Sequence, residues 1–308
     1  MIKRTLYFGN PANLRLRDRQ LSIESTVNGE TKSASVPVED IGIVVIDHPQ
    51  ITVTSGLIQL LQEENVALIT CDYRHMPQSL LLPIEGNKVQ QERYEAQIAA
   101  SEPLKKQLWA QTISQKIRNQ AAVLSNLGID ANYLVPLYRN VKSGDADNCE
   151  ATAAAFYWQS VFVRHVTGFR RVARVQGLQQ APPPAPNNFL NYGYSILRAT
   201  MARSLVCAGL LPTLGIFHRN RYNAYCLADD LMEPYRPYVD AVVHQMLADF
   251  GLPEDLTTEH KAVLLKIPAL DVLIEGEKSP LMIATQRTAV SLVKCFMGEQ
   301  RKLIYPEL

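Results

Sequence analysis

Four residues whose side chains could bind a metal ion lie at the edges of a long acid-free stretch of the chain. In chain order they are Glu150, His218, Asp230 and Glu233. Carboxylate oxygens together with one imidazole nitrogen form a mixed ligand set that Mg²⁺ or Mn²⁺ accepts, and it leaves open positions for water and phosphate oxygens. Such an ion can activate a hydroxyl nucleophile and stabilise charge on a transferring phosphate. These residues therefore predict a metal site for phosphodiester chemistry.

The acid-free stretch itself is strongly basic. Between Glu150 and Asp229 the chain has 78 consecutive residues with neither a carboxylate nor a lysine. The stretch carries a charge of +8 while the whole chain carries +1, so the remainder carries −7. Arginine binds phosphate through a planar, bidentate contact. We therefore expect a polyanionic partner whose backbone is bound by Arg164, Arg170, Arg171, Arg174, Arg198, Arg203, Arg219 and Arg221.

Each candidate ligand also has a simpler explanation. Glu150 stands at the expected start of a helix, where an acidic residue complements the helix dipole. A lone histidine that follows an apolar segment, as His218 does, is more often a hydrogen-bonded core residue than a ligand. Asp230 and Glu233 fit a capping box, although the same spacing places both carboxylates on one face of a helix. Their combination beside the arginines is what favours the metal site.

Composition limits the class of protein. The 308 residues are 47% hydrophobic, enough for a sizeable core in one large or two ordinary domains. The first residues lack the apolar run of a signal peptide, and the longest uncharged apolar stretch, 204–217, is too short to cross a bilayer. The five cysteines form no CxxC pair, which argues against a disulfide framework and against structural zinc. We expect a cytoplasmic protein without a membrane partner.

The first 86 residues are predicted to be rich in strands. Apolar and polar residues alternate through 14–24, and Asn28-Gly29 is typical of a hairpin turn. The continuous apolar runs at 41–46 and 66–71 suit strands that are covered on both faces. A short helix over 57–64, capped by Ser55, separates them. Residues 1–86 are thus expected to form a small β-sandwich that mediates assembly.

Residues 87–308 show helical spacing instead. The pattern predicts long helical segments over 90–126, 151–166, 189–207, 239–250 and 281–300. We therefore predict an α+β protein of two domains, with the small β-sandwich followed by a larger all-α catalytic domain.

Four segments together resemble a known family, and they span most of the chain. They are HPQITVTSGLIQLLQEENVALITCD, DADNCEATAAAFYW, NNFLNYGYSILRA and GLLPTLGIFHRNRYNAYCLADDLMEPYRPYVD. This set is similar to the CRISPR-associated protein Cas1, the spacer-acquisition integrase, and most similar to the branch that accompanies type II, Cas9 systems.

The resemblance implies a site, a reaction and partners. The metal ligands of the family map onto Glu150, His218 and Glu233, and Asp230 matches another acidic position near the site, as an alternative or supporting residue. The family uses Mg²⁺ or Mn²⁺ and acts as homodimers, two of which are bridged by a Cas2 dimer on double-stranded DNA. In type II systems, Cas9 and accessory acquisition proteins are further partners. The implied reaction is attack by a 3′-hydroxyl of an incoming fragment on phosphodiesters at the ends of a CRISPR repeat.

Three alternatives remain open from the residues alone. A metal-dependent nuclease on branched or free DNA would use the same site with water as the nucleophile. A non-catalytic DNA-binding scaffold would use the acidic residues only as helix caps. A helical protein whose arginines form internal ion pairs would have no salt-dependent affinity for DNA.

Overall fold

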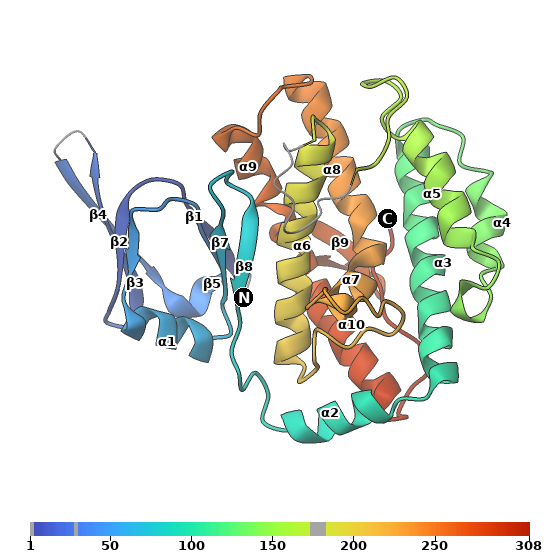
Figure 1. Cartoon of the computed structure of the whole chain (residues 1–308), viewed down its shortest axis with the longest axis horizontal. Coiled ribbons are helices and arrows are strands. Elements are labelled where there is room, and N and C mark those ends of the chain that lie inside the picture. The colour runs from blue at the N-terminus through green and yellow to red at the C-terminus, as the bar shows by residue number, and fades with distance from the viewer. Residues whose placement is uncertain (1–2, 28–29, 173–182) are drawn as a thin grey trace.

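The computed structural model describes residues 3–27, 30–172 and 183–308 of the chain. Strands come first and helices dominate after residue 86, with the sheets on the left of Figure 1 and the helices on the right. The N-terminal strands are β1 (Arg4–Phe8), β2 (Ala12–Arg17), β3 (Gln20–Val27), β4 (Glu30–Pro37), β5 (Ile41–Ile46), β6 (Ile51–Val53), β7 (Ala67–Cys71) and β8 (Pro77–Leu81).

These strands form two four-stranded sheets. One has the order β1-β5-β7-β8, with β1, β5 and β7 parallel and β8 antiparallel; the other has the order β4-β3-β2-β6. Leu14 and Leu21 of the second sheet share a buried core with Val44 and Leu68 of the first, and helix α1 (Ser55–Glu63) contributes to the same core. The sheets are thus the two layers of the predicted β-sandwich. The predicted hairpin turn at residues 28–29 lies outside the described residues, although β3 and β4 pair antiparallel as expected.

The strand β5 is buried on both faces. Its residue Val44 faces the sandwich core, whereas Ile43 and Val45 belong to the larger core of the helical domain. This arrangement explains why its sequence is continuously apolar rather than alternating. One face of the first sheet therefore packs against the sandwich core, and the other face packs against the helical domain.

The second part of the chain is mostly helical, which confirms the predicted fold class. Its helices are α2 (Gln90–Ala99), α3 (Glu102–Asn126), α4 (Leu134–Arg139), α5 (Cys149–Ser160), α6 (Asn187–Cys207), α7 (Cys226–Met232), α8 (Arg236–Phe250), α9 (Thr258–Leu264) and α10 (Leu281–Phe296). The domain is not purely helical, because β9 (Asp271–Ile274) and β10 (Glu277–Pro280) form an antiparallel hairpin. None of the helices that the structure describes is long and apolar enough to span a membrane.

Helix α6 is the centre of the helical domain. Eighteen of its 21 residues are buried, and Figure 1 shows it between the sheets and the outer helices. At Gly193 a Cβ atom would lie 2.6 Å from Cγ1 of Val239, so the glycine permits the close approach of α6 and α8. This packing fixes the position of α8. It also fixes α7, because the short 3₁₀ helix Glu233–Tyr235 connects the two helices directly.

Candidate metal and DNA site

Glu150 lies in the first turn of α5, and it is not the residue that caps this helix. Asp145 takes that role, because its carboxylate accepts hydrogen bonds from the backbone N–H groups of Cys149 (2.9 Å) and Glu150 (3.0 Å). The side chain of Glu150 instead turns toward α3, where its Oε1 lies 2.6 Å from Nζ of Lys116. Glu150 thus lies in the first turn of α5, as the helix-dipole explanation predicts, but its carboxylate also pairs with a lysine of another helix.

Glu233 lies where α7 meets α8 and is 6% exposed. Its Oε2 is 2.6 Å from Nζ of Lys116, and its Oε1 is 2.8 Å from Nε of Arg236. Burial by itself would raise the pKa of Glu233, but the charges of Arg236 and Lys116 outweigh burial and hold this pKa below its usual range. Glu233 is therefore a carboxylate held in its ionised form, as a metal ligand must be.

The sequence analysis missed Lys116, which contacts both glutamates. Burial lowers the pKa of its ammonium, but the carboxylates of Glu233 and Glu150 outweigh burial and raise it. A signal was present in the sequence: Lys116 is three residues after Ile113 and four before Gln120, both of which are buried on α3. That spacing places it on the buried face of the helix.

His218 lies in the loop between α6 and α7, and Asp230 of α7 fixes its position. Asp230 is fully buried, and its Oδ1 lies 2.5 Å from Nδ1 of His218. Its Oδ2 accepts a hydrogen bond from the backbone N–H of Phe217 at 2.9 Å. If Nδ1 donates to Asp230, Nε2 of His218 carries the lone pair that a metal would use. This hydrogen bond raises the pKa of His218 despite partial burial.

The His218 loop also depends on a glycine. A Cβ atom at Gly215 would lie 2.5 Å from the carbonyl oxygen of His218 and 2.7 Å from Oδ2 of Asp230. The imidazole packs edge-on against the ring of Trp109 from α3, with the centroids 5.4 Å apart. The loop is therefore held by its backbone, by Asp230 and by an aromatic contact.

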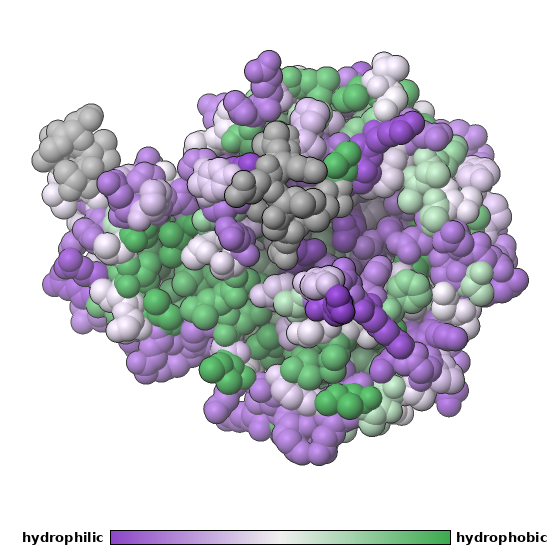
Figure 2. Space-filling view, viewed as in Figure 1, coloured by the Kyte–Doolittle hydropathy of each residue, from purple (hydrophilic) through white to green (hydrophobic). Residues whose placement is uncertain are grey.

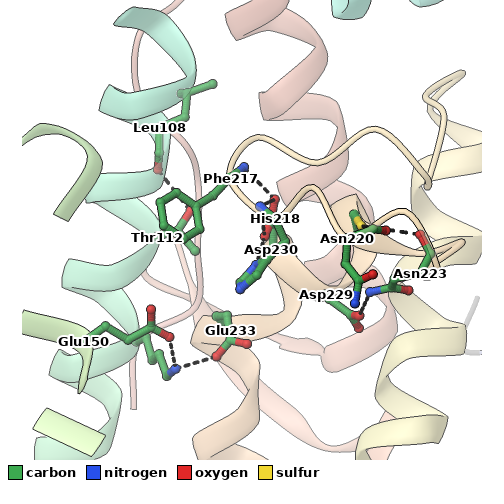
Figure 3. A network of polar contacts seen from close by, with 12 residues as sticks. Leu108, Thr112, Glu150, Phe217, His218, Asn220, Asn223, Asp229, Asp230 and Glu233 are labelled. Carbon is green, nitrogen blue, oxygen red and sulfur yellow. Dashed lines mark hydrogen bonds and ion pairs between the residues drawn. The ribbon is translucent and has the colours of Figure 1, made fainter. Parts of the chain in front are cut away.

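The predicted capping box of Asp230 and Glu233 is wrong. Asp230 lies inside α7 rather than at its start, and it binds the His218 loop. Figure 3 shows the side chains of Glu150, His218 and Glu233 pointing toward one another from three separate elements.

Comparisons with known proteins place this chain in a family. The model of the family described as "CRISPR associated protein Cas1" matches residues 6–276. The chain is 37% identical to a CRISPR-associated endonuclease Cas1 from Neisseria meningitidis, over 94% of this chain and 91% of that protein. It is also 27% identical to a second such endonuclease, from Pyrobaculum aerophilum, over 87% and 92%. This chain belongs to the Cas1 family.

Solved structures agree with the Cas1 fold. A casposase bound to its integration product has a TM-score of 0.79 at 21% identity, over 98% of this chain and 92% of that one. A Cas1 protein from Thermotoga maritima has a TM-score of 0.74 at 15% identity, over 96% and 98%. The relative from Neisseria meningitidis, a type II organism, also agrees with the predicted branch of the Cas1 family.

The arginines predicted to bind DNA fall into groups with different surroundings. Arg164, Arg170, Arg219 and Arg221 are exposed. Arg219 pairs with Glu102 at the surface. Arg171 and Arg198 are partly buried: Arg171 donates to the side chains of Asn187 and Asn191, and Arg198 forms a bidentate pair with Asp229. Arg174 lies outside the described residues.

Arg203 is a correction to the predicted DNA contacts. It is 3% exposed, and its Nε donates a hydrogen bond to the backbone oxygen of Asn65 in the N-terminal domain. Its guanidinium is therefore a link between the two domains and is not accessible to a phosphate. For Arg198 and Arg203, the alternative in which arginines make internal contacts describes the structure better.

The donor set suits Mg²⁺ or Mn²⁺, although the ligands do not converge on one point. Within the described residues, no three His, Cys, Asp or Glu side chains lie close enough together to share a metal ion. Nζ of Lys116 lies between Glu150 and Glu233, 2.6 Å from a carboxylate oxygen of each. Two carboxylate oxygens that already bind one cation, beside an imidazole held by a carboxylate, have the chemistry of a divalent site.

Proposed function

We propose that this member of the Cas1 family is a metal-dependent DNA integrase and endonuclease. It inserts short foreign DNA fragments into a CRISPR array by attack of a fragment 3′-hydroxyl on phosphodiesters at the repeat ends. The observation that carries this proposal is that Glu150 and Glu233 share one cation, Lys116, while the side chain of His218, held by Asp230, points toward them. The solved casposase structure, which is described as bound to an integration product, has the same fold. This likeness supports the proposal.

In this proposal Glu150, His218 and Glu233 hold Mg²⁺ or Mn²⁺. The ion, when bound, lowers the pKa of an attacking hydroxyl and stabilises charge on the phosphate. Asp230 keeps the proton of His218 on Nδ1, so that Nε2 faces the site. The exposed arginines Arg219 and Arg221, in the same loop as His218, would contact the DNA backbone beside the reacting phosphate.

We further propose that the protein acts in the cytoplasm on double-stranded DNA, as homodimers bridged by a Cas2 dimer, with Cas9 as a further partner. A solved Cas6-RT-Cas1–Cas2 complex contains a chain with this fold, at a TM-score of 0.72 and 17% identity, of which this chain covers 36%. Figure 2 shows hydrophobic side chains gathered over the N-terminal sheets, while the helical half of that face is mostly hydrophilic. Such a surface supports an assembly role for residues 1–86.

A nuclease that uses water is the second candidate, because the relatives from Neisseria meningitidis and Pyrobaculum aerophilum carry the name endonuclease. The two reactions differ in the nucleophile, so the test is an assay with purified protein, its Cas2 partner, Mn²⁺, a repeat-bearing plasmid and a short duplex. Integration predicts covalent joining that disappears when both 3′ ends of the duplex are dideoxy-terminated. Plasmid nicking that is unaffected by these ends, without joined product, would contradict the integrase and support the nuclease.

A non-catalytic scaffold predicts a third result in the same assay. Such a protein would bind the duplex equally with Mn²⁺ and with EDTA, and it would neither join nor nick DNA.

A further inference from the structure

Lys116 lies between two of the candidate metal ligands, but it is not itself one of the ligands that the family resemblance implies. Its Nζ is 2.6 Å from Oε1 of Glu150 and 2.6 Å from Oε2 of Glu233. The lysine side chain is only 12% exposed and that of Glu233 is 7% exposed. One ammonium group therefore pairs with one buried and one partly buried carboxylate at the same time, and the dashed lines at Glu150 and Glu233 in Figure 3 mark these ion pairs.

The two carboxylates need a shared cation to stay together. Like charges at short distance in a partly buried site repel strongly, and the repulsion would favour protonating one group or moving it away. Arg236 neutralises the other oxygen of Glu233 at 2.8 Å, but it belongs to the helix that follows Glu233. Lys116 comes from α3, a third element, and joins the start of α5 to the start of α8.

A divalent ion bound by the same two glutamates would occupy the space that Nζ fills. The ion and the ammonium group cannot both occupy that space, because Nζ already lies within 2.6 Å of an oxygen of each glutamate. Lysine suits an exchangeable position, because its ammonium is compact, strongly hydrated and carried on a flexible chain. The metal and the lysine are thus alternative occupants.

We propose that Lys116 is the built-in counter-cation of the metal site. Without metal it keeps the carboxylates of Glu150 and Glu233 close together, and Mg²⁺ or Mn²⁺ displaces it on binding. Lys116 is thus a positioning residue that sets the metal concentration at which the site fills. The inference rests on the proposed function, because it takes these two glutamates as metal ligands.

The test compares Mn²⁺ binding by the full-length wild type, Lys116→Met and Lys142→Met at pH 8, with free Mn²⁺ measured by electron paramagnetic resonance. Methionine keeps most of the length of the side chain and removes its charge. We expect Lys116→Met to bind Mn²⁺ about tenfold more tightly, because the competing cation is gone. Lys142 is the matched control, since it pairs with Asp147 at the surface (2.8 Å), and its loss should leave the affinity unchanged.

Thermal melting gives a second readout. Without metal, Lys116→Met should melt at a lower temperature than wild type, and saturating Mn²⁺ should restore most of the difference. Affinity equal to or weaker than that of wild type would overturn the inference while leaving the metal site intact. So would a Lys116→Met protein that stays unfolded in saturating Mn²⁺, because the ion could then not replace the lysine.

Wild-type protein gives the distinguishing result. If the wild type binds no Mn²⁺, or if Glu150→Gln binds it equally well, the proposed metal site fails. The role of Lys116 then fails with it.

Discussion

At the scale of single residues, the protonation of His218 is expected to control how tightly the site binds a metal ion. Its pKa is raised above the ordinary value of 6.5, chiefly by the hydrogen bond to Asp230. This bond favours the imidazolium, whereas a metal needs the neutral ring. The affinity for Mn²⁺ should therefore rise as the pH increases through 6.5 and beyond. Calorimetric titrations between pH 6 and 8.5 test this, and a His218→Ala protein should bind weakly with a flatter pH dependence.

Asp230 has a different role from Glu233 in this account. Asp230→Asn replaces one acceptor oxygen by an NH₂ group, which would face either the backbone N–H of Phe217 or Nδ1 of His218. Because the residue supports a ligand without being one, we expect Mn²⁺ affinity to fall by about 10- to 100-fold rather than to vanish. A protein with wild-type affinity would show that His218 needs no such support.

At the scale of elements, the His218 loop depends on the absence of a side chain at Gly215. Gly215→Ala would force a Cβ atom to within 2.5 Å of the carbonyl oxygen of His218, so the loop must shift. We expect weaker Mn²⁺ binding and a lower melting temperature. Gly56→Ala in α1 is the control, since the nearest atom to its Cβ would be 4.0 Å away, and this protein should bind metal normally.

The element predictions succeeded where the hydrophobic pattern was decisive. The apolar runs of β5 and β7 and the helical spacing over 239–250 are local signals of burial. These elements are largely buried, although Phe250 at the end of α8 is 44% exposed. The predicted helix over 90–126 is in fact two helices, because the chain breaks at Ala100 and Ser101 caps α3. The β9–β10 hairpin was missed because its strands are only four residues long.

The site was predictable only in part. Glu150, His218 and Glu233 could be selected by residue type and family motif, but their partners depend on packing. Lys116 pairs with Glu150 across 34 residues and with Glu233 across 117, and no sequence spacing reports such contacts. For the same reason, Arg203 was predicted at the DNA surface although it lies on a buried part of α6.

At the scale of the whole molecule, a buried ion pair joins the two domains. Lys261 of α9 lies 2.7 Å from Asp47, which follows β5, and both side chains are nearly inaccessible. Burial would raise the pKa of Asp47, but hydrogen bonds from Lys261, Tyr7 and His75 outweigh burial and lower it. The resulting stability is present above the ordinary carboxyl pKa and is lost as the pH falls through the lowered one.

Removing the lysine of this pair should destabilise the whole protein. Lys261→Met leaves Asp47 buried with weaker partners, which costs about 3 kcal/mol. Urea unfolding at pH 7 measures this, with Lys142→Met as a surface control. A loss below about 0.5 kcal/mol would mean that the hydrogen bonds with Tyr7 and His75 are enough to stabilise the buried Asp47 carboxylate.

DNA binding should depend on the arginines that remain exposed. If the four accessible ones, Arg164, Arg170, Arg219 and Arg221, all contact phosphates, the plot of log K against log salt should have a slope of about −3 to −4. The double variant Arg219→Ala/Arg221→Ala should reduce this slope by about 2. A slope near zero for the wild type would remove the polyanion interpretation.

The most direct test of the account is strand transfer by Glu233→Gln. The substitution keeps the shape of the side chain and removes the charge that a metal ligand needs. With Cas2, a 3′-hydroxyl duplex, a repeat-bearing plasmid and Mn²⁺, we expect joined product to be lost while DNA affinity stays within about twofold of wild type. Glu277→Gln, at the exposed end of β10, is the control and should integrate normally. Normal strand transfer by Glu233→Gln would contradict the proposed metal site.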